Sequence, residues 1–155
     1  VMAFSPAARA GVIRWVMERY GNRIYFVYSG EQNREALPEY GIAELPAGYV
    51  ETQRYASPGS ALVVYEDQSG GAINLVYDYM SEGAMASYTL NEDDVFDITV
   101  HGMNGLFFQT RISGNNNSLT WIDESQNIQF SVDGNFDMEQ LLALAESVSL
   151  CKTPK

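Results

Sequence analysis

Short runs of apolar, β-branched and aromatic residues recur along this chain, and turn-forming residues separate them. The clearest pair, 61–67 and 72–80, flanks a polar turn at 68–71, which predicts an antiparallel hairpin. The runs 118–124 and 126–132 are joined only across residue 125 and predict a second hairpin. Further strands are expected over 23–29, 49–55, 86–90, 95–101 and 106–112.

Two other segments repeat apolar residues at the 3.6-residue period of a helix. The first begins at Ser5 and Pro6, because serine can cap exposed amides and proline is tolerated at the first helical position. Gly21 and Asn22 end it, so we expect a helix that runs to about Tyr20. Its apolar stripe would consist of Val12, Ile13, Val16, Met17 and Tyr20.

The second helix, near the C-terminus, has a complete set of start signals. Asp137 can act as the N-cap, and Gln140 follows three residues later, which is the spacing of a capping box. Phe136 and Leu141 occupy the two positions of a hydrophobic staple. We expect this helix to lie on the sheet through a stripe formed by Met138, Leu141, Leu142, Ala145 and Val148.

Together these elements predict an α+β fold: a curved antiparallel sheet of about eight strands, with an N-terminal and a C-terminal helix packed on one face. Residues 30–48 are polar and contain Pro38 and Pro46, so we interpret them as a connection with a short helical turn around 35–40. The expected organisation is an N-terminal helix over 1–22, leading from an upstream membrane segment, and a single α+β domain over 23–151.

The composition and net charge of the chain limit the classes of molecule that it can bind. The chain has 155 residues, of which 46% are hydrophobic, and this suffices for one domain with a real core. Its formal net charge is −11 at pH 7, so its surface repels phosphate backbones and anionic membranes. We therefore expect no nucleic acid partner, while a protein, a peptide or a glycan remains open.

No apolar run approaches the roughly 18 to 20 residues that span a bilayer. The chain begins with Val1, and its first four residues are either the end of an apolar segment or the remnant of a tag. We expect contact with a membrane only through an upstream helix that is absent from this chain.

The sequence contains one histidine and one cysteine, and neither residue indicates a catalysed reaction. His101 is the only histidine, and no Gly-x-Ser-x-Gly motif accompanies it, so we interpret it as a partly exposed residue at a strand end. Cys151 is the only cysteine, which excludes an internal disulfide. A reactive thiol needs a neighbouring cation held in place, and Lys152 near the chain end is a poor one. We expect no catalytic residue and no cofactor.

Glu92, Asp93, Asp94 and Asp97 form the densest cluster of carboxylates. Hard cations such as calcium bind several such oxygens at once. The spacing differs from that of an EF-hand, which requires Asp-x-Asp-x-Asp-Gly and a distal glutamate. We interpret the cluster as a solvated acidic turn and expect no metal site.

Four tyrosines in predicted strands are the candidate ligand-binding residues: Tyr65, Tyr77, Tyr79 and Tyr88. Aromatic faces and phenol hydroxyls suit sugars and peptides, so these side chains could line a groove. Alternatively, they pack in the core and across neighbouring strands, as strand aromatics usually do. In either case Tyr77 and Tyr79 should share one face of their strand.

A family resemblance rests on several short patterns. Upstream they are Ser5-Pro6, Arg9-Ala10, Val12 with Trp15, and Leu45-Pro46-x-Gly48-Tyr49. In the C-terminal third they are Val100-x-Gly102, Gly105, Leu119-Thr120-Trp121, Ile128-x-Phe130 and the helix that ends at Val148. With these patterns the chain resembles the family called domain of unknown function 4367.

The resemblance implies an extracytoplasmic domain that follows a single transmembrane helix in proteins of Gram-positive bacteria. Some of these proteins resemble membrane-bound anti-sigma factors, which act in signal transduction. The resemblance implies no catalytic residues. Trp121 is its most specific landmark, and we expect this side chain to anchor the sheet under the C-terminal helix.

The leading hypothesis is therefore a non-enzymatic, extracytoplasmic sensing or interaction domain, tethered to the membrane at the cell surface. The alternative is a secreted or cell-surface module that binds a carbohydrate or a peptide through the aromatic sheet face. A third hypothesis is a hydrolase built on paired carboxylates, which the sequence alone does not assign.

Overall fold

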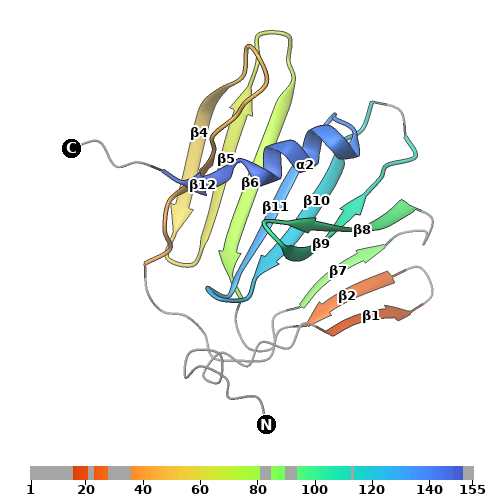
Figure 1. Ribbon diagram of the computed structural model, residues 1–155. Helices are drawn as coiled ribbons and strands as arrows, with labels where there is room; N and C mark the ends of the chain where they lie inside the picture. Colours follow the sequence, from red (N-terminus) through yellow and green to blue (C-terminus); the bar gives the residue numbers. More distant parts are fainter. Residues whose placement is uncertain are drawn as a thin grey trace.

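The structure is a computed structural model that describes residues 16–20, 23–27, 36–80, 85–89, 94–112 and 114–151. In these residues the strands form three antiparallel sheets, accompanied by one short helix (Figure 1). The large antiparallel sheet and the C-terminal helix are confirmed. The described part of the chain is nevertheless mainly β.

The largest sheet has seven strands, all antiparallel to their neighbours. In spatial order they are β4 (Val50–Ser57), β5 (Ser60–Glu66), β6 (Ala72–Tyr79), β11 (Ile128–Gly134), β10 (Asn117–Asp123), β9 (Met103–Phe108) and β8 (Val95–Val100). The two predicted hairpins are confirmed as β5–β6 and β10–β11. The edge strand β4 carries a bulge between Glu51 and Gln53.

Two smaller sheets accompany the large one. β3 (Tyr40–Ile42) pairs with β12 (Val148–Leu150), and the pairing continues at its ends, where the Ala43 N–H donates to the Ser147 carbonyl at 3.0 Å. The third sheet has the order β1 (Val16–Tyr20), β2 (Arg23–Val27) and β7 (Met85–Thr89).

The helix α2 (Met138–Glu146) lies across one face of the large sheet and contacts β8, β10 and β11 (Figure 1). Its capping box is confirmed, because Asp137 Oδ1 accepts the Gln140 N–H at 2.8 Å and Gln140 Oε1 accepts the Asp137 N–H at 3.1 Å. Leu141 is buried, as predicted, and Phe136 is half-buried against the core. The staple contact between Phe136 and Leu141 stays a prediction.

The predicted N-terminal helix is wrong where the structure describes it, because Val16–Tyr20 form the strand β1. This strand pairs antiparallel with β2, in which isoleucine, tyrosine, phenylalanine and valine have high strand propensity. Five residues are too few to separate a 3.6-residue period from a 2-residue period, and pairing with β2 decides the outcome. Residues 1–15, with the rest of the predicted helix, lie outside the described residues.

Three boundaries also differ from the prediction. β9 spans Met103–Phe108, whereas a strand over 106–112 was expected. It begins at Met103 because His101 and Gly102 both adopt positive φ, at 51° and 76°, and complete a tight turn from β8. Tyr40 begins a strand where a helical turn was expected. Val148 begins β12 instead of ending the helical stripe, since it pairs with Ile42.

The core lies between the large sheet on one side and α2, β3 and β12 on the other. Trp121 is only 1% exposed and stacks on its cross-strand partner Phe130, with ring centroids 5.0 Å apart and planes 7° apart. Gly105 lies opposite Trp121 on β9, where a Cβ atom would come within 2.5 Å of the Thr120 carbonyl oxygen. Glycine therefore allows β9 to approach the central strand closely.

Replacing Trp121 by alanine should lower the free energy of unfolding by about 3–5 kcal/mol, because it removes a large buried aromatic side chain. The matched change Ile112→Ala, at a side chain that is 64% exposed, should stay within about 0.5 kcal/mol of wild type. Urea denaturation of the three proteins measures both. A small loss of stability at Trp121 together with a large loss of partner binding would contradict an anchoring role.

Candidate functional site

Tyr65 and Tyr77 are buried in the core and do not line an open groove; they are 2% and 1% exposed. The Tyr77 hydroxyl accepts the N–H of Tyr40 at 3.0 Å, and the Tyr65 hydroxyl accepts the N–H of Ile42 at 2.9 Å. Burial raises the pKa of Tyr65, which keeps its hydroxyl neutral. The two hydroxyls therefore fasten β3 to the large sheet.

The other two candidate tyrosines do not complete a groove. Tyr79 shares the face of Tyr77, as predicted, and its half-buried side chain donates a hydrogen bond to the Ala36 carbonyl at 3.3 Å. Tyr88 belongs to β7, in a different sheet, and its side chain lies outside the described residues. The four tyrosines thus form no common aromatic surface in the described part of the chain.

Arg54 completes the attachment of β3. Its Nη1 donates to the Tyr40 carbonyl at 3.0 Å, and its Nη2 donates to the Glu51 carboxylate at 2.7 Å. The hydrogen bonds that Arg54 donates to the Glu51 carboxylate raise the pKa of Arg54, so the guanidinium stays charged. The exposed Cys151 thiol lies 3.7 Å from Nη2. The cation beside Cys151 is therefore Arg54, which is remote in sequence and which the sequence analysis did not identify.

His101 is an exposed residue at the end of β8, as predicted. Its backbone N–H donates to both carboxylate oxygens of Glu146 at 3.2 Å, and its Nδ1 lies 3.3 Å from Glu146 Oε2. These contacts join the β8–β9 turn to the last turn of α2, so the role of His101 is structural.

The acidic cluster is divided by the fold. Asp94 accepts a hydrogen bond from Arg111 Nε at 2.6 Å, whereas Asp97 lies on β8. Glu92 and Asp93 lie outside the described residues. In the ranges that the structure describes, no group of three or more histidine, cysteine, aspartate or glutamate residues is arranged to hold a metal ion.

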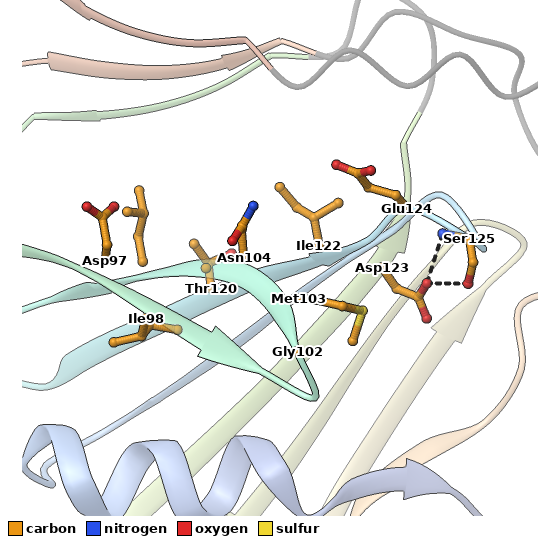
Figure 2. A pocket seen from close by; sticks show the side chains of 12 residues that line it. Asp97, Ile98, Gly102, Met103, Asn104, Thr120, Ile122, Asp123, Glu124 and Ser125 are labelled. Atoms are coloured by element: carbon orange, nitrogen blue, oxygen red, sulfur yellow. Dashed lines mark hydrogen bonds between the residues drawn. The ribbon is translucent and has the colours of Figure 1, made fainter. Parts of the chain in front are cut away.

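A pocket of about 740 Å³ has lining side chains on both faces of the large sheet (Figure 2). Ile98, Met103 and Asp123 point to the side of α2, and we call the opposite face the outer face. Strands β8, β9 and β10 and the turn after β10 line it. Figure 2 shows Asp97, Asn104, Ile122 and Glu124 on the outer side of these strands. We call this site the acidic pocket, since Asp97, Asp123 and Glu124 belong to its lining.

The carboxylates of the acidic pocket differ in what they bind. Asp123 accepts hydrogen bonds from the Ser125 N–H at 3.0 Å and from Gln126 Nε2 at 3.0 Å, so it is occupied by its own turn. The side chains of Asp97, Asn104 and Glu124 have no hydrogen bond or ion pair with the described residues, and no lysine, arginine or histidine is among the described lining. The pocket therefore offers mainly acceptors to a ligand.

A row of outer-face residues extends from the pocket across the sheet. Ile122, Gln129 and Asp78 are cross-strand partners in turn on β10, β11 and β6, and Asn104 precedes Gly105, the β9 partner of Trp121. Gln129 is only 8% exposed; its Nε2 donates to Thr120 Oγ1 at 3.2 Å, while no donor of the described residues reaches its Oε1. The Asp78 carboxylate has no hydrogen bond or ion pair in the described part, and burial raises its pKa.

Comparison with models of protein families identifies the family to which this chain belongs. A model of the family described as Domain of unknown function (DUF4367) matches residues 39–148. The chain belongs to this family. No curated protein and no solved structure matches the chain significantly.

The DUF4367 match begins immediately before β3 and ends at the first residue of β12. The two-stranded sheet therefore joins the two ends of the DUF4367 unit. The patterns at residues 5–15 lie before the matched range. In the described residues of this DUF4367 protein, no helix is long and apolar enough to cross a membrane.

The sequence analysis named Asp97 but missed Asn104, Glu124, Gln129 and Asp78. Polar residues that alternate with apolar ones indicate a solvent-facing side of a strand, and that pattern gives no sign of which strands become neighbours. In the DUF4367 fold, β6 lies beside β11 although their sequences are far apart. Only this crossover places Asp78 next to Gln129.

Replacing Tyr65 or Tyr77 by phenylalanine should each lower the free energy of unfolding by about 1–3 kcal/mol, because a buried N–H of β3 loses its acceptor. The matched control Tyr55→Phe, at a residue that is 58% exposed, should change it by less than about 0.5 kcal/mol. Urea denaturation gives the energies, and amide exchange at Tyr40 and Ile42 reports the lost bonds. Unchanged stability and exchange in both buried variants would contradict the attachment.

Asp78→Asn should raise the melting temperature at pH 7. Because burial raises the folded-state pKa of Asp78 above its ordinary value of 3.8, the folded protein binds the proton more tightly than the unfolded chain. Wild type should therefore lose stability relative to the variant as pH rises through the folded pKa, and the difference should vanish below the unfolded pKa.

Calorimetry over this pH range provides the measurement. The control Asp133→Asn removes another carboxylate of β11, which accepts hydrogen bonds from Asn74 and Asn116, at 3.2 and 3.3 Å. This control should lose stability at neutral pH instead of gaining it. A pH-independent effect of Asp78→Asn would show that the asparagine acts through packing and not through ionisation.

Proposed function

We propose that this DUF4367 domain is an extracytoplasmic sensing or interaction domain of a membrane-anchored protein of Gram-positive bacteria, related to the anti-sigma type. Binding of a ligand on the outer side would change the state of a cytoplasmic partner through the membrane tether. Family membership supports this proposal, because the resemblance described above implies such a context.

The acidic pocket is the observation that carries the proposal. A volume of about 740 Å³ is within the range of small-molecule sites, which lies at about 300–1,000 Å³. The side chains of Asp97, Asn104 and Glu124 have no partner among the described residues, and the partly buried Ile122 provides apolar contact. A concave surface with unoccupied polar groups is what a sensing domain requires.

We further propose that the domain acts without catalysing a reaction. Hydrolysis by paired carboxylates needs one protonated acid and one ionised partner, which their environments must separate. Asp97 and Glu124 are both exposed, and the turn of Asp123 already occupies its carboxylate. These surroundings favour a binding site over an acid–base pair.

A secreted or cell-surface carbohydrate- or peptide-binding module is the second candidate. The burial of Tyr65 and Tyr77 removes the aromatic surface on which this function would depend. The acidic pocket nevertheless favours it in one respect, because Asp97 and Asn104 could accept hydrogen bonds from sugar hydroxyls or peptide N–H groups.

Protease treatment of intact bacteria that express the full-length gene tests the proposed location. The domain should be cleaved outside the cell, while a cytoplasmic marker protein stays intact until the cells are lysed. The reading frame should encode a membrane span or an export signal ahead of Val1. A domain that is cleaved only after lysis, from a gene without either signal, would refute the proposal.

A further inference from the structure

The outer face of β4, β5 and β6 carries a group of apolar side chains. The strand registers place Tyr55, Leu62 and Val76 in one row across these strands, with Val64 in the next row. Tyr55 is 58% exposed, and Val50, on the same face of β4, is 61% exposed. We call these five residues the outer patch. Exposed apolar residues that lie together on a sheet indicate an interaction surface.

The rim of the outer patch is acidic. Glu66 is the cross-strand partner of Val50, and Asp78 lies two residues beyond Val76 on β6. In the seven strands of the large sheet Arg54 is the only lysine or arginine, and its guanidinium reaches the core side. A second copy of this chain, with its net charge of −11, would bring like charges to this rim. A basic partner with an apolar surface fits it better.

Basic residues are concentrated at the start of the chain. The DUF4367 unit over 39–148 has two arginines and no lysine. Residues 1–15, which lie outside the described residues, contain Arg9 and Arg14 and no acidic residue. The same segment includes several large apolar residues, which are Met2, Phe4, Val12, Ile13 and Trp15. It therefore has the chemistry that the outer patch would bind.

Chain connectivity brings this segment within reach of the outer patch. Val16 pairs with Val27, and Val27 pairs with Met85, so the start of β1 lies at the same end of its sheet as the start of β7. Five peptide bonds join Met85 to Met80 at the end of β6, which limits their Cα–Cα distance to about 17 Å. With strands about 4.8 Å apart, Val16 lies within about 27 Å of Met80, and residues 1–15 can extend up to about 50 Å.

We propose that residues 1–15 dock on the outer patch, with Arg9 and Arg14 at its acidic rim. The apolar neighbours of these arginines would pack on Tyr55, Leu62 and Val64. Because the contact is made within one chain, the segment is present at a high effective concentration. The consequence rests on the proposed function, in which residues 1–15 follow the membrane helix. Docking would then hold the domain against its own tether, and release of the segment would be the signal.

Trypsin tests this contact, because it cleaves after Arg9 and Arg14 and a docked segment is protected. In the intact chain both sites should be cut about tenfold more slowly than in a free peptide of residues 1–20. Val50→Ser combined with Tyr55→Ser should speed cleavage of the chain about fivefold, since it removes the most exposed part of the outer patch. Mass spectrometry of timed samples gives the rates.

A matched control separates the outer patch from exposed apolar residues in general. Ile112→Ser combined with Leu150→Ser changes side chains of similar exposure, 64% and 61%, away from the outer patch, and should leave the cleavage rate unchanged. Urea denaturation should show that both double variants keep the stability of wild type, as expected at exposed positions. An unchanged rate in Val50→Ser/Tyr55→Ser, or equal acceleration by both pairs, would overturn the proposal.

A nitroxide label reports where the segment docks. Attached to Ala10→Cys in a chain that also carries Cys151→Ser, the label should broaden the amide signals of Val64 and Val76 more than that of Leu141, on the helix across the sheet. High salt should weaken this difference, because the arginines meet an exposed acidic rim. Broadening that is no greater on the outer patch than on α2 would contradict docking at this place.

The outcome is separable from that of the proposed function. A domain that protease reaches on intact cells, but whose residues 1–15 do not dock, would refute the contact alone. A docked segment in a protein that lies inside the cell would refute the extracytoplasmic role and leave the contact standing.

Discussion

The attachment of β3 by two tyrosine hydroxyls is the constraint on which the rest of this fold depends. In β3, one edge of the backbone pairs with β12, and the N–H groups of Tyr40 and Ile42 point away from that partner. No strand of the large sheet pairs with this second edge, so Tyr77 and Tyr65 supply the acceptors. Because β12 follows directly after α2, fastening β3 also fixes where the helix ends on the core. The hydroxyls thus connect the two layers, a task that aliphatic side chains at these positions would not perform.

Local signals were sufficient for most of the large sheet and for its helix. Hairpins and helix caps depend on residues that are close in sequence. Turn residues therefore predict the β5–β6 and β10–β11 hairpins, and Asp137 with Gln140 predicts the start of the helix. Val16–Tyr20 were assigned wrongly for the opposite reason. Their apolar spacing fits a helix, whereas pairing with β2 makes them a strand, and single-sequence periodicity contains no information about pairing.

The candidate site was harder to predict than the fold. Tyrosine alternation in β5 and β6 was compatible with a ligand groove and with a core, and burial of Tyr65 and Tyr77 decides for the core. The residues that remain available on the outer face come from four strands whose order includes the β6–β11 crossover. The sequence does not show that Asp78 lies beside Gln129, because their proximity depends on the strand order of the sheet.

The bulge in β4 has a consequence for how copies of this domain meet. Among the described strands β4 has a neighbour on one side only, and an edge of this kind offers unpaired N–H and C=O groups to any extended chain. The bulge between Glu51 and Gln53 interrupts that row, and the charged Arg54 points to the core side of the same strand. Both features discourage another strand from docking. Copies of the domain can therefore meet at this edge without joining their sheets into a continuous fibre.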